Sequence, residues 1–304
     1  MKSHQDDESI KAVIFDIKRN CSEDGPGIRS TVFFKGCPLR CVWCQNPEGQ
    51  SIKPDIFFYS QSCDPKTCGR PCIRVCPEKC ISLKKTLFID KSKCNGCQLC
   101  VAVCPTEALK KVGYFITLKD LLYKVLIDKP FYDSTGGGVT LSGGEATYQM
   151  DFIHLFLREL KKRKIHTVLE TAGLFPYESF QEKALPYLDM IYFDLKLMNE
   201  SMSLKYMGVS NKKILANFER LCGEKSIKLI PRIPLIPEIT ATEENLGCIS
   251  AFLREHQVKE CSLLPYNPLW YDKMDWLGIK PEYINLKHMS PEDLNRCLKY
   301  MKSF

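Results

Sequence analysis

Apolar and polar positions along the chain follow two alternating patterns. Short runs rich in β-branched and aromatic residues predict β-strands, and longer segments with apolar residues three and four positions apart predict helices. The predicted strands cover residues 11–18, 31–35, 139–142, 165–171, 189–195, 227–235 and 260–265. The predicted helices begin at Thr117, cover about 148–163, 177–185, 211–223 and 243–256, and end with one from Ser290. Because strands and helices alternate, we predict an α/β fold with a parallel sheet.

Residues 51–112 differ from the rest of the chain in composition. They are rich in cysteine, proline and lysine, and their apolar runs are as short as Ile56–Tyr59 and Thr86–Ile89. So few apolar residues cannot form a core without a metal scaffold. We therefore predict a main domain from residues 1–50 and 113–304, and an inserted module from residues 51–112.

The overall composition narrows the class of protein. The chain has 304 residues, of which 44% are hydrophobic, enough for one large domain and a small one. Its 43 Lys and Arg exceed its 36 Asp and Glu only mildly and form no basic runs, so we expect no nucleic-acid binding. Met1–Ser9 is polar and no stretch approaches 18 apolar residues, so we expect no signal peptide, no membrane contact and a cytoplasmic location.

Cysteine is the most informative residue type, because 13 of the 17 cysteines precede residue 105 in ligand-like spacings. Cys37, Cys41 and Cys44 share one short loop after a predicted strand. Three thiolates leave one corner of a four-iron cluster open, where a ligand can bind while the cluster still delivers an electron. The alternative is a zinc site, although structural zinc prefers four closed ligands. Trp43 is either a core residue or a shield between such a cluster and water.

The inserted module contains two further cysteine sets. The second set, Cys94, Cys97, Cys100 and Cys104 followed by proline, has the spacing of a ferredoxin, in which the fourth thiolate binds a neighbouring cluster. The first set, Cys63, Cys68, Cys72 and Cys76, has longer spacings. Crossed ligation would join Cys104 to Cys63, Cys68 and Cys72, and Cys76 to Cys94, Cys97 and Cys100, with Cys80 as an alternative ligand. The module is thus predicted to be ferredoxin-like, with two [4Fe-4S] clusters.

Polar residues gather where predicted strands end. Gly143, Gly144 and Glu145 follow one strand, Glu170 ends another, and Asp194 and Lys196 end a third. In a parallel sheet these ends meet at one edge, where ligands bind. The alternative for Gly143, Gly144 and Glu145 is an ordinary structural turn. The alternative for Glu170, Asp194 and Lys196 is a set of structural ion pairs, since an unpaired buried charge is costly.

Several motifs, read together, give a family resemblance that covers nearly the entire chain. They are Asp24–Arg29, Phe34–Glu48, the ferredoxin-like insert, Ser142–Glu145, Asp194–Lys196, Gly208–Asn211, Arg232–Pro234 and Leu264–Tyr266. The chain resembles the radical S-adenosylmethionine (SAM) enzymes that activate glycyl radical enzymes, in the subgroup with two extra four-iron clusters. This resemblance implies a partial (β/α)6 barrel.

The resemblance also implies roles for individual residues. Cys37, Cys41 and Cys44 would hold the cluster that chelates SAM, and Gly143, Gly144 and Glu145 would contact the SAM amine. Asp194, Lys196 and Arg232 match positions near SAM, and Glu170 and Asp194 match carboxylates near a monovalent cation. Asp24 matches a position that meets the partner's glycine loop.

The implied reaction is reductive cleavage of SAM, after which a 5′-deoxyadenosyl radical removes a Cα hydrogen from a glycine of a partner glycyl radical enzyme. Flavodoxin or ferredoxin would supply the electron to a monomeric enzyme with three [4Fe-4S] clusters. The chain departs from the family pattern at Asn267, Ala146 and Pro237–Ala241, which bears on partner recognition. The competing hypotheses are a radical SAM enzyme acting on a small molecule or peptide, and a non-catalytic iron–sulfur electron carrier or zinc-binding protein.

Overall fold

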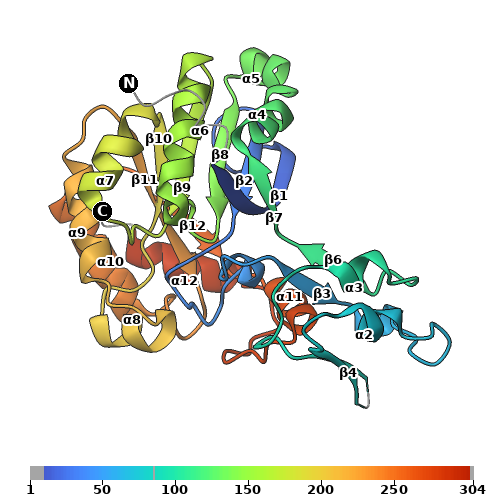
Figure 1. The fold of residues 1–304 in the computed structure, drawn as a ribbon. Helices are drawn as coiled ribbons and strands as arrows, with labels where there is room; N and C mark the ends of the chain where they lie inside the picture. The colour runs from blue at the N-terminus through green and yellow to red at the C-terminus, as the bar shows by residue number, and fades with distance from the viewer. Residues whose placement is uncertain (1–9, 85, 302–304) are drawn as a thin grey trace.

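The computed structural model describes residues 10–84 and 86–301 (Figure 1). Met1–Ser9, on which the prediction of no signal peptide rests, lies outside this part of the chain. One eight-stranded sheet has the strand order β12-β11-β10-β9-β8-β2-β1-β7. Its strands are β1 (Lys11–Cys21), β2 (Arg29–Phe34), β7 (Tyr114–Thr117), β8 (Gly138–Gly143), β9 (His166–Thr171), β10 (Met190–Asp194), β11 (Lys228–Leu235) and β12 (Ser262–Pro265). Every strand predicted from the sequence is present.

Six strands of this sheet, β2 and β8 to β12, are parallel, as predicted. The prediction of a wholly parallel sheet was wrong at one edge, where β1 pairs antiparallel with both β2 and β7. Only residues 22–28 join β1 to β2, and a parallel connection needs a crossover of a dozen or more residues. The short connection therefore forces the antiparallel pairing.

Helices follow most of the strands and cover the outer face of the sheet. They are α4 (Leu118–Leu126), α5 (Lys129–Thr135), α6 (Met150–Lys162), α7 (Tyr177–Lys183), α8 (Glu200–Met207), α9 (Lys212–Cys222), α10 (Glu243–Glu255), α11 (Trp270–Leu277) and α12 (Pro291–Met301). The predicted helices are confirmed, but α5, α8 and α11 were missed. In Figure 1, α6, α7, α9 and α10 lie side by side on the left of the sheet. Within the described residues, no helix is both long and apolar enough to cross a bilayer.

The main core lies between the sheet and these helices. Leu141, Leu169, Ile191 and Ile233 occupy the centres of four neighbouring strands and are fully buried. Strands of a parallel sheet carry helices on one face and line the site on the other, so their side chains alternate between an apolar and a polar environment. This alternation directs the polar residues of the same strands to the inner face.

Residues 55–112 form a small, separate layer at the lower right of Figure 1. It contains the antiparallel pairs β3 (Asp55–Phe58) with β6 (Leu109–Val112) and β4 (Ile81–Leu83) with β5 (Leu87–Ile89), and the short helices α2 (Pro71–Val75) and α3 (Leu99–Ala102). Its cluster of buried core residues contains Ile56, Cys72, Cys80, Ile81, Leu87, Cys100 and Leu109. Three of these seven are cysteines, so cysteine sulfur supplies much of this small core.

Candidate functional site

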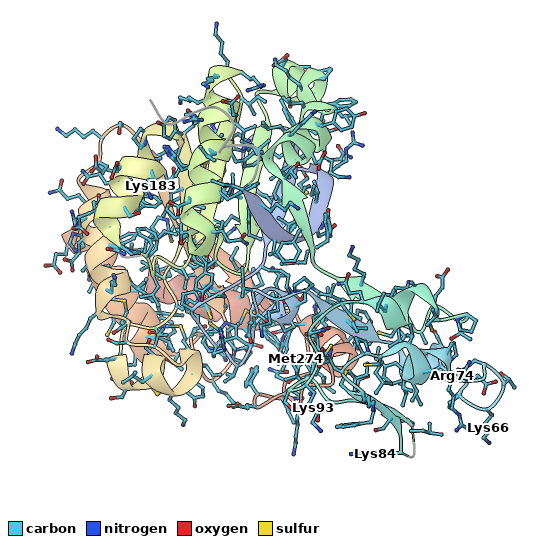
Figure 2. All side chains as sticks on the ribbon, in the orientation of Figure 1. Lys66, Arg74, Lys84, Lys93, Lys183 and Met274 are labelled. Atoms are coloured by element: carbon cyan, nitrogen blue, oxygen red, sulfur yellow. The ribbon has the colours of Figure 1, made fainter. Side chains whose placement is uncertain are left out.

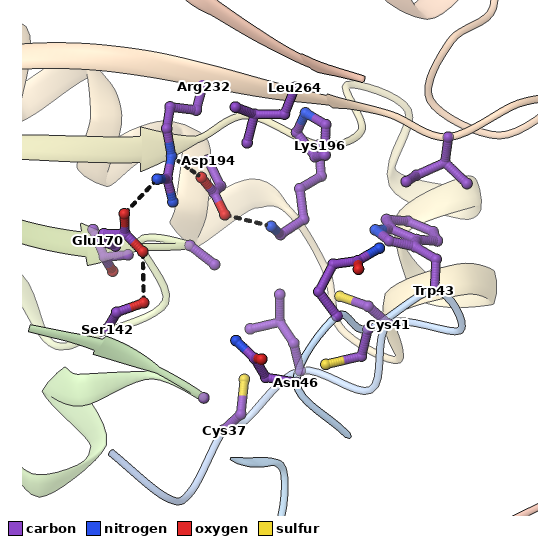
Figure 3. Close-up of a pocket in the computed structure, with 18 of the residues that line it drawn as sticks. Cys37, Cys41, Trp43, Asn46, Ser142, Glu170, Asp194, Lys196, Arg232 and Leu264 are labelled. Atoms are coloured by element: carbon purple, nitrogen blue, oxygen red, sulfur yellow. Dashed lines mark hydrogen bonds and ion pairs between the residues drawn. The ribbon is translucent and has the colours of Figure 1, made fainter. Parts of the chain in front are cut away.

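A cavity of about 430 Å³ lies where the six parallel strands end (Figure 3). This size is typical of a small-molecule site. All six strand ends or the loops that follow them contribute to its wall, through Cys37, Ser142, Glu170, Asp194, Arg232 and Pro265. Of the residues predicted for the site, Cys37, Cys41, Trp43, Cys44, Gly143, Gly144, Glu170, Asp194, Lys196 and Arg232 all line the cavity.

The loop after β2 brings Cys37, Cys41 and Cys44 to one side of this cavity. Its backbone is held from several directions. Gly36 N donates to Gly49 O at 2.7 Å, and Cys44 N donates to Cys41 O at 3.2 Å. The middle of the loop is tied to the end of α8, since Arg40 N donates to Met207 O at 2.8 Å and Val42 N to Tyr206 O at 3.0 Å. The loop is therefore fixed by a helix whose contacting residues lie 164 and 167 positions further along the chain.

The three thiols suit a metal cluster better than a solvent-filled pocket. Burial raises the pKa of all three, and raises that of Cys41 to about 12, so the thiols stay protonated at neutral pH unless a metal stabilises the thiolates. Among the described residues, these are the only cysteines that line this cavity, and no histidine joins them. Trp43 is 3% exposed and lines the cavity beside the loop. A cluster here would have three protein ligands and one side facing the cavity.

A row of charged groups lies across the cavity from the cysteines (Figure 3). Arg232 on β11 is at its centre, where Nη1 donates to Glu170 Oε1 at 2.5 Å and Nε donates to Asp194 Oδ1 at 3.0 Å. Beyond these, Ser142 Oγ donates to Glu170 Oε2 at 2.5 Å, and Lys196 Nζ donates to Asp194 Oδ2 at 2.7 Å. Two carboxylates thus face one guanidinium and one ammonium, and the formal charges of the row cancel.

The pKa values in this row differ between its two carboxyls. Burial raises the pKa of Glu170 above its usual range, against the opposing effect of Arg232. Burial acts on Asp194 in the same direction, but Lys196 and Arg232 outweigh it and lower the pKa. For Lys196, burial alone would lower the pKa, yet Asp194 and Cys41 raise it. Asp194 and Lys196 are therefore held as an ion pair at neutral pH.

Glu145 is the one residue of the glycine turn that does not line the cavity. Its side chain is buried and its carboxylate accepts hydrogen bonds from Thr147 Oγ1 at 2.7 Å, Thr171 Oγ1 at 2.9 Å and Ala172 N at 2.9 Å. Gly143 has φ +113°, and a Cβ there would lie 2.4 Å from the backbone of Phe34. In this structure Glu145 therefore braces the strand ends, while Gly143 and Gly144 form the cavity wall.

Asp24 lies outside this cavity, in the loop that joins β1 to β2. Thr31 Oγ1 donates to Asp24 Oδ2 at 2.6 Å, and Thr140 Oγ1 donates to Asp24 O at 2.8 Å. These bonds hold the loop against β2 and β8, and the Asp24 side chain stays partly exposed.

Comparisons with known proteins show the family. The profile of the Radical SAM superfamily matches residues 91–246, that of a 4Fe-4S single cluster domain matches residues 23–70, and that of the LdpA Fe-S cluster-binding domain matches residues 63–115. The chain is 36% identical over 277 residues to the isethionate sulfite-lyase activating enzyme of Nitratidesulfovibrio vulgaris, covering 89% of each chain. It is 37% identical over 298 residues to the trans-4-hydroxy-L-proline dehydratase activating enzyme of Clostridioides difficile, covering 97% of each.

The chain belongs to the radical SAM superfamily, among the activating enzymes of glycyl radical enzymes. Among solved structures it is similar to a domain of pyruvate-formate lyase-activating enzyme from Bacteroides vulgatus, with 26% identity and a TM-score of 0.44 over 55% of this chain and 93% of that one.

In this radical SAM protein, the cysteines of residues 55–112 form two groups. The outer group is Cys63, Cys68, Cys72 and Cys104. Burial, and then the proximity of the other three, raises the pKa of Cys63. The inner group lines a common hollow and contains Cys76, Cys80, Cys94, Cys97 and Cys100. Gln98 ties the inner group to β3 and to the residue between β6 and β7, since its Nε2 donates to Asp55 O at 3.3 Å and Gly113 O at 3.0 Å.

This grouping places Cys104 with the first cysteine set and Cys76 with the second, the arrangement that crossed ligation requires. It also places five thiols in the inner group, where a four-iron cluster needs four. Cys76 Sγ and Cys80 Sγ are 3.4 Å apart. The structure thus narrows the choice of the fourth inner ligand to these two neighbours.

Sequence reasoning missed several residues of the site. Gln45 and Asn46 line the cavity. They follow Cys44 directly in the sequence, so their place beside the cysteine loop could have been predicted. Lys273 on α11 was not predictable, because it lies more than 200 residues away. Its Nζ donates to Gln45 O at 3.0 Å and Asn46 Oδ1 at 3.1 Å, and pairs with Glu48 Oε1 at 2.7 Å. Lys273 therefore fixes the end of the cysteine loop.

Proposed function

We propose that this protein cleaves SAM reductively and removes a Cα hydrogen from a glycine of a partner glycyl radical enzyme. One observation carries the proposal: among the described residues, three cysteines without a fourth share a cavity with a charge-balanced row of charged side chains. The family to which the chain belongs supports the same chemistry and favours it over a non-catalytic electron carrier.

Cys37, Cys41 and Cys44 would hold a [4Fe-4S] cluster, which would supply the electron for cleavage of SAM to methionine and a 5′-deoxyadenosyl radical. Gly143 and Gly144 expose their backbone to the cavity without side chains, so a ligand can approach closely.

The charged row would orient SAM from the opposite wall. The pKa shifts of Asp194 and Lys196 keep both groups charged at neutral pH. Glu170 and Asp194 both form ion pairs with Arg232 in this structure. A monovalent cation bound at these two carboxylates is a prediction that rests on the family resemblance alone. Trp43 would limit the access of water to the cluster.

We further propose that residues 51–112 form a ferredoxin-like module with two more [4Fe-4S] clusters, which gives three in all. The outer group supplies four thiols and the inner group five, of which Cys76 or Cys80 completes the set. A flavodoxin or a ferredoxin would deliver electrons to a monomeric, cytoplasmic enzyme. A simple two-cluster ferredoxin pattern accounts neither for the fifth inner thiol nor for the longer spacings of the first cysteine set.

Sequence similarity to known activating enzymes does not identify the partner enzyme of this protein. Relatives at 34–37% identity are activating enzymes of isethionate sulfite-lyase, indoleacetate decarboxylase, trans-4-hydroxy-L-proline dehydratase and choline trimethylamine-lyase. These chemistries differ widely while the identities are nearly equal. Asp24 is proposed to meet the partner's glycine loop, because it is partly exposed on the loop that crosses β2 and β8.

The test is to mix anaerobically reconstituted protein, SAM and dithionite with candidate glycyl radical enzymes and record electron paramagnetic resonance spectra. We expect a glycyl doublet with the correct partner and none with the Cys41→Ala variant. The Asp24→Ala variant should still cleave SAM but transfer the radical poorly. A doublet of full intensity with Cys41→Ala would refute the proposed ligand set.

A further inference from the structure

The positive charge of this protein is concentrated in one small part of the chain. Residues 51–112 contain 11 Lys and Arg against 5 Asp and Glu, which leaves 32 against 31 in the rest of the chain. About a fifth of the residues therefore carries nearly the whole net charge of +7. The net positive charge per residue is therefore small over the whole chain but large within this module.

Few cations of the module form ion pairs within the described residues. Lys91 pairs with Asp55 at 2.5 Å and Lys93 with Asp90 at 3.6 Å. Lys66, Arg74 and Lys84 are exposed, and no carboxylate of the described residues forms an ion pair with them. These three cations are called the basic edge below.

The basic edge lies at the side of the module that faces away from the sheet, as Figure 2 shows. Lys66 is in the loop between Cys63 and Cys68, and Arg74 is on α2 two residues after Cys72. Both therefore border the outer cysteine group. Cations that served only to neutralise cluster thiolates would be buried against sulfur, whereas these side chains are exposed to solvent.

Phe88 lies beside these cations on the hairpin β4–β5, where it is 42% exposed and Lys84 Nζ lies 3.7 Å from the centre of its ring. Leu83 pairs with Leu87 and Phe88 with Ser82, so Leu83 points to the other face of the hairpin. An aromatic residue beside exposed cations is the composition expected of a protein-binding surface, with an apolar centre and a charged rim. An exposed aromatic ring adds apolar contact area, which favours a surface that binds another protein over one that only repels other molecules.

We infer that the basic edge docks an acidic one-electron donor protein. The inference rests on the proposed function, because SAM cleavage needs one electron from outside the chain. In the docked complex the donor loses one electron and this protein gains one, and no atom is transferred. Opposite charge steers association and aligns the two surfaces, and it brings the donor to the outer cysteine group, which Lys66 and Arg74 border.

The test compares two double variants with the same change in net charge. Lys66→Glu/Lys84→Glu reverses the basic edge without touching the backbone bonds of the cysteine loops. Lys119→Glu/Lys124→Glu is the control, since both lysines are exposed on α4 of the main domain. The probes are an acidic flavodoxin and an acidic ferredoxin. Calorimetry measures the affinity of each for the reconstituted holoenzyme, and stopped-flow absorbance measures oxidation of each reduced donor.

We expect the basic-edge variant to bind at least one donor about tenfold more weakly at low ionic strength, and added salt to remove most of the difference. The control variant should match the wild type. All three proteins should cleave SAM equally under dithionite, so a wild type that fails there refutes the proposed function and not the docking surface.

Three results would overturn the docking inference. The first is equal affinity and equal electron-transfer rate in wild type and basic-edge variant for both donors. The second is an equal loss in the control variant, which would make the effect one of net charge alone. The third is unchanged donor binding with a weaker glycyl doublet under dithionite, which would assign the basic edge to the glycyl radical partner.

Discussion

At the residue scale, part of the charged row was predictable from the sequence and part was not. Glu170, Asp194 and Lys196 were predicted to meet, because charged residues at the ends of adjacent parallel strands share one edge. The central position of Arg232 was not predicted, since it depends on register: Asp194 pairs directly with Arg232 across β10 and β11. Register is a property of the folded sheet and is not visible in the order of residues.

Arg232→Met should destabilise the fold, because it leaves the Glu170 and Asp194 side chains, only 12% and 18% exposed, without their shared cation. Removing one member of a buried ion pair costs about 3–5 kcal/mol. Chemical denaturation at neutral pH measures this loss. Arg232→Lys is the matched control and should lose less, since it keeps the charge but cannot bind both carboxylates at once. Equal stability of wild type and Arg232→Met would show that the row is not a coupled network.

His166 predicts a pH dependence of stability. Burial, and then the neighbouring Arg29 guanidinium, lowers the pKa of His166 below its usual value. The unfolded state therefore binds a proton more readily than the folded state, and stability should fall as pH decreases through about 6.5 and below. His166→Gln should flatten this part of the curve in thermal denaturation measured between neutral and mildly acidic pH. An unchanged slope would exclude His166 as its source.

At the scale of elements, the strongly periodic helices and the β-branched strands were predictable, but α8 and α11 were not. The α8 sequence Glu200–Met207 mixes methionine, serine and lysine without an apolar face, so pattern analysis gave no signal. Its helical start depends on one capping bond, in which Asn199 Oδ1 accepts from Met202 N at 3.1 Å. The missed helix matters for function, because its last carbonyls hold the cysteine loop.

Asn199→Ala should therefore affect the cluster as well as stability. Loss of such a cap costs about 1 kcal/mol, and it should loosen the contacts of Tyr206 O and Met207 O with the cysteine loop. We expect faster loss of iron to a chelator, measured by absorbance. Thr242→Ala removes the comparable cap of α10 and is the control. The idea fails if both variants lose iron at the same rate.

The inner cysteine group offers a second test at this scale. Cys76→Ser and Cys80→Ser each remove one of two adjacent thiols from a group of five. If Cys76 alone is the fourth ligand, Cys76→Ser should lose the iron of one cluster and Cys80→Ser should lose none, as measured by iron content and Mössbauer spectra. Full iron in both single variants and loss in the double variant would show that either thiol can serve.

At the scale of the whole molecule, the cysteine-rich segment was predictable as a separate unit, but its attachment was not. Trp276 on α11 packs against Phe57 of β3 and against Tyr59, which follows β3, with ring centres 5.4 and 4.8 Å away. Lys35, fully buried before the cysteine loop, donates to Glu48 O beside this junction. These contacts join segments distant in sequence, so no local sequence pattern predicts them. They couple the insert to the loop that carries Cys37, Cys41 and Cys44.

The central claim is that these three cysteines leave one iron open for SAM. The most direct measurement is electron–nuclear double resonance on the reduced protein with SAM labelled in the methionine amine and carboxylate by ¹⁵N and ¹⁷O. The account predicts hyperfine coupling of both labels to a cluster that is absent from the Cys41→Ala variant. Absence of coupling in the wild type, or zinc in place of iron at this triad, would contradict it.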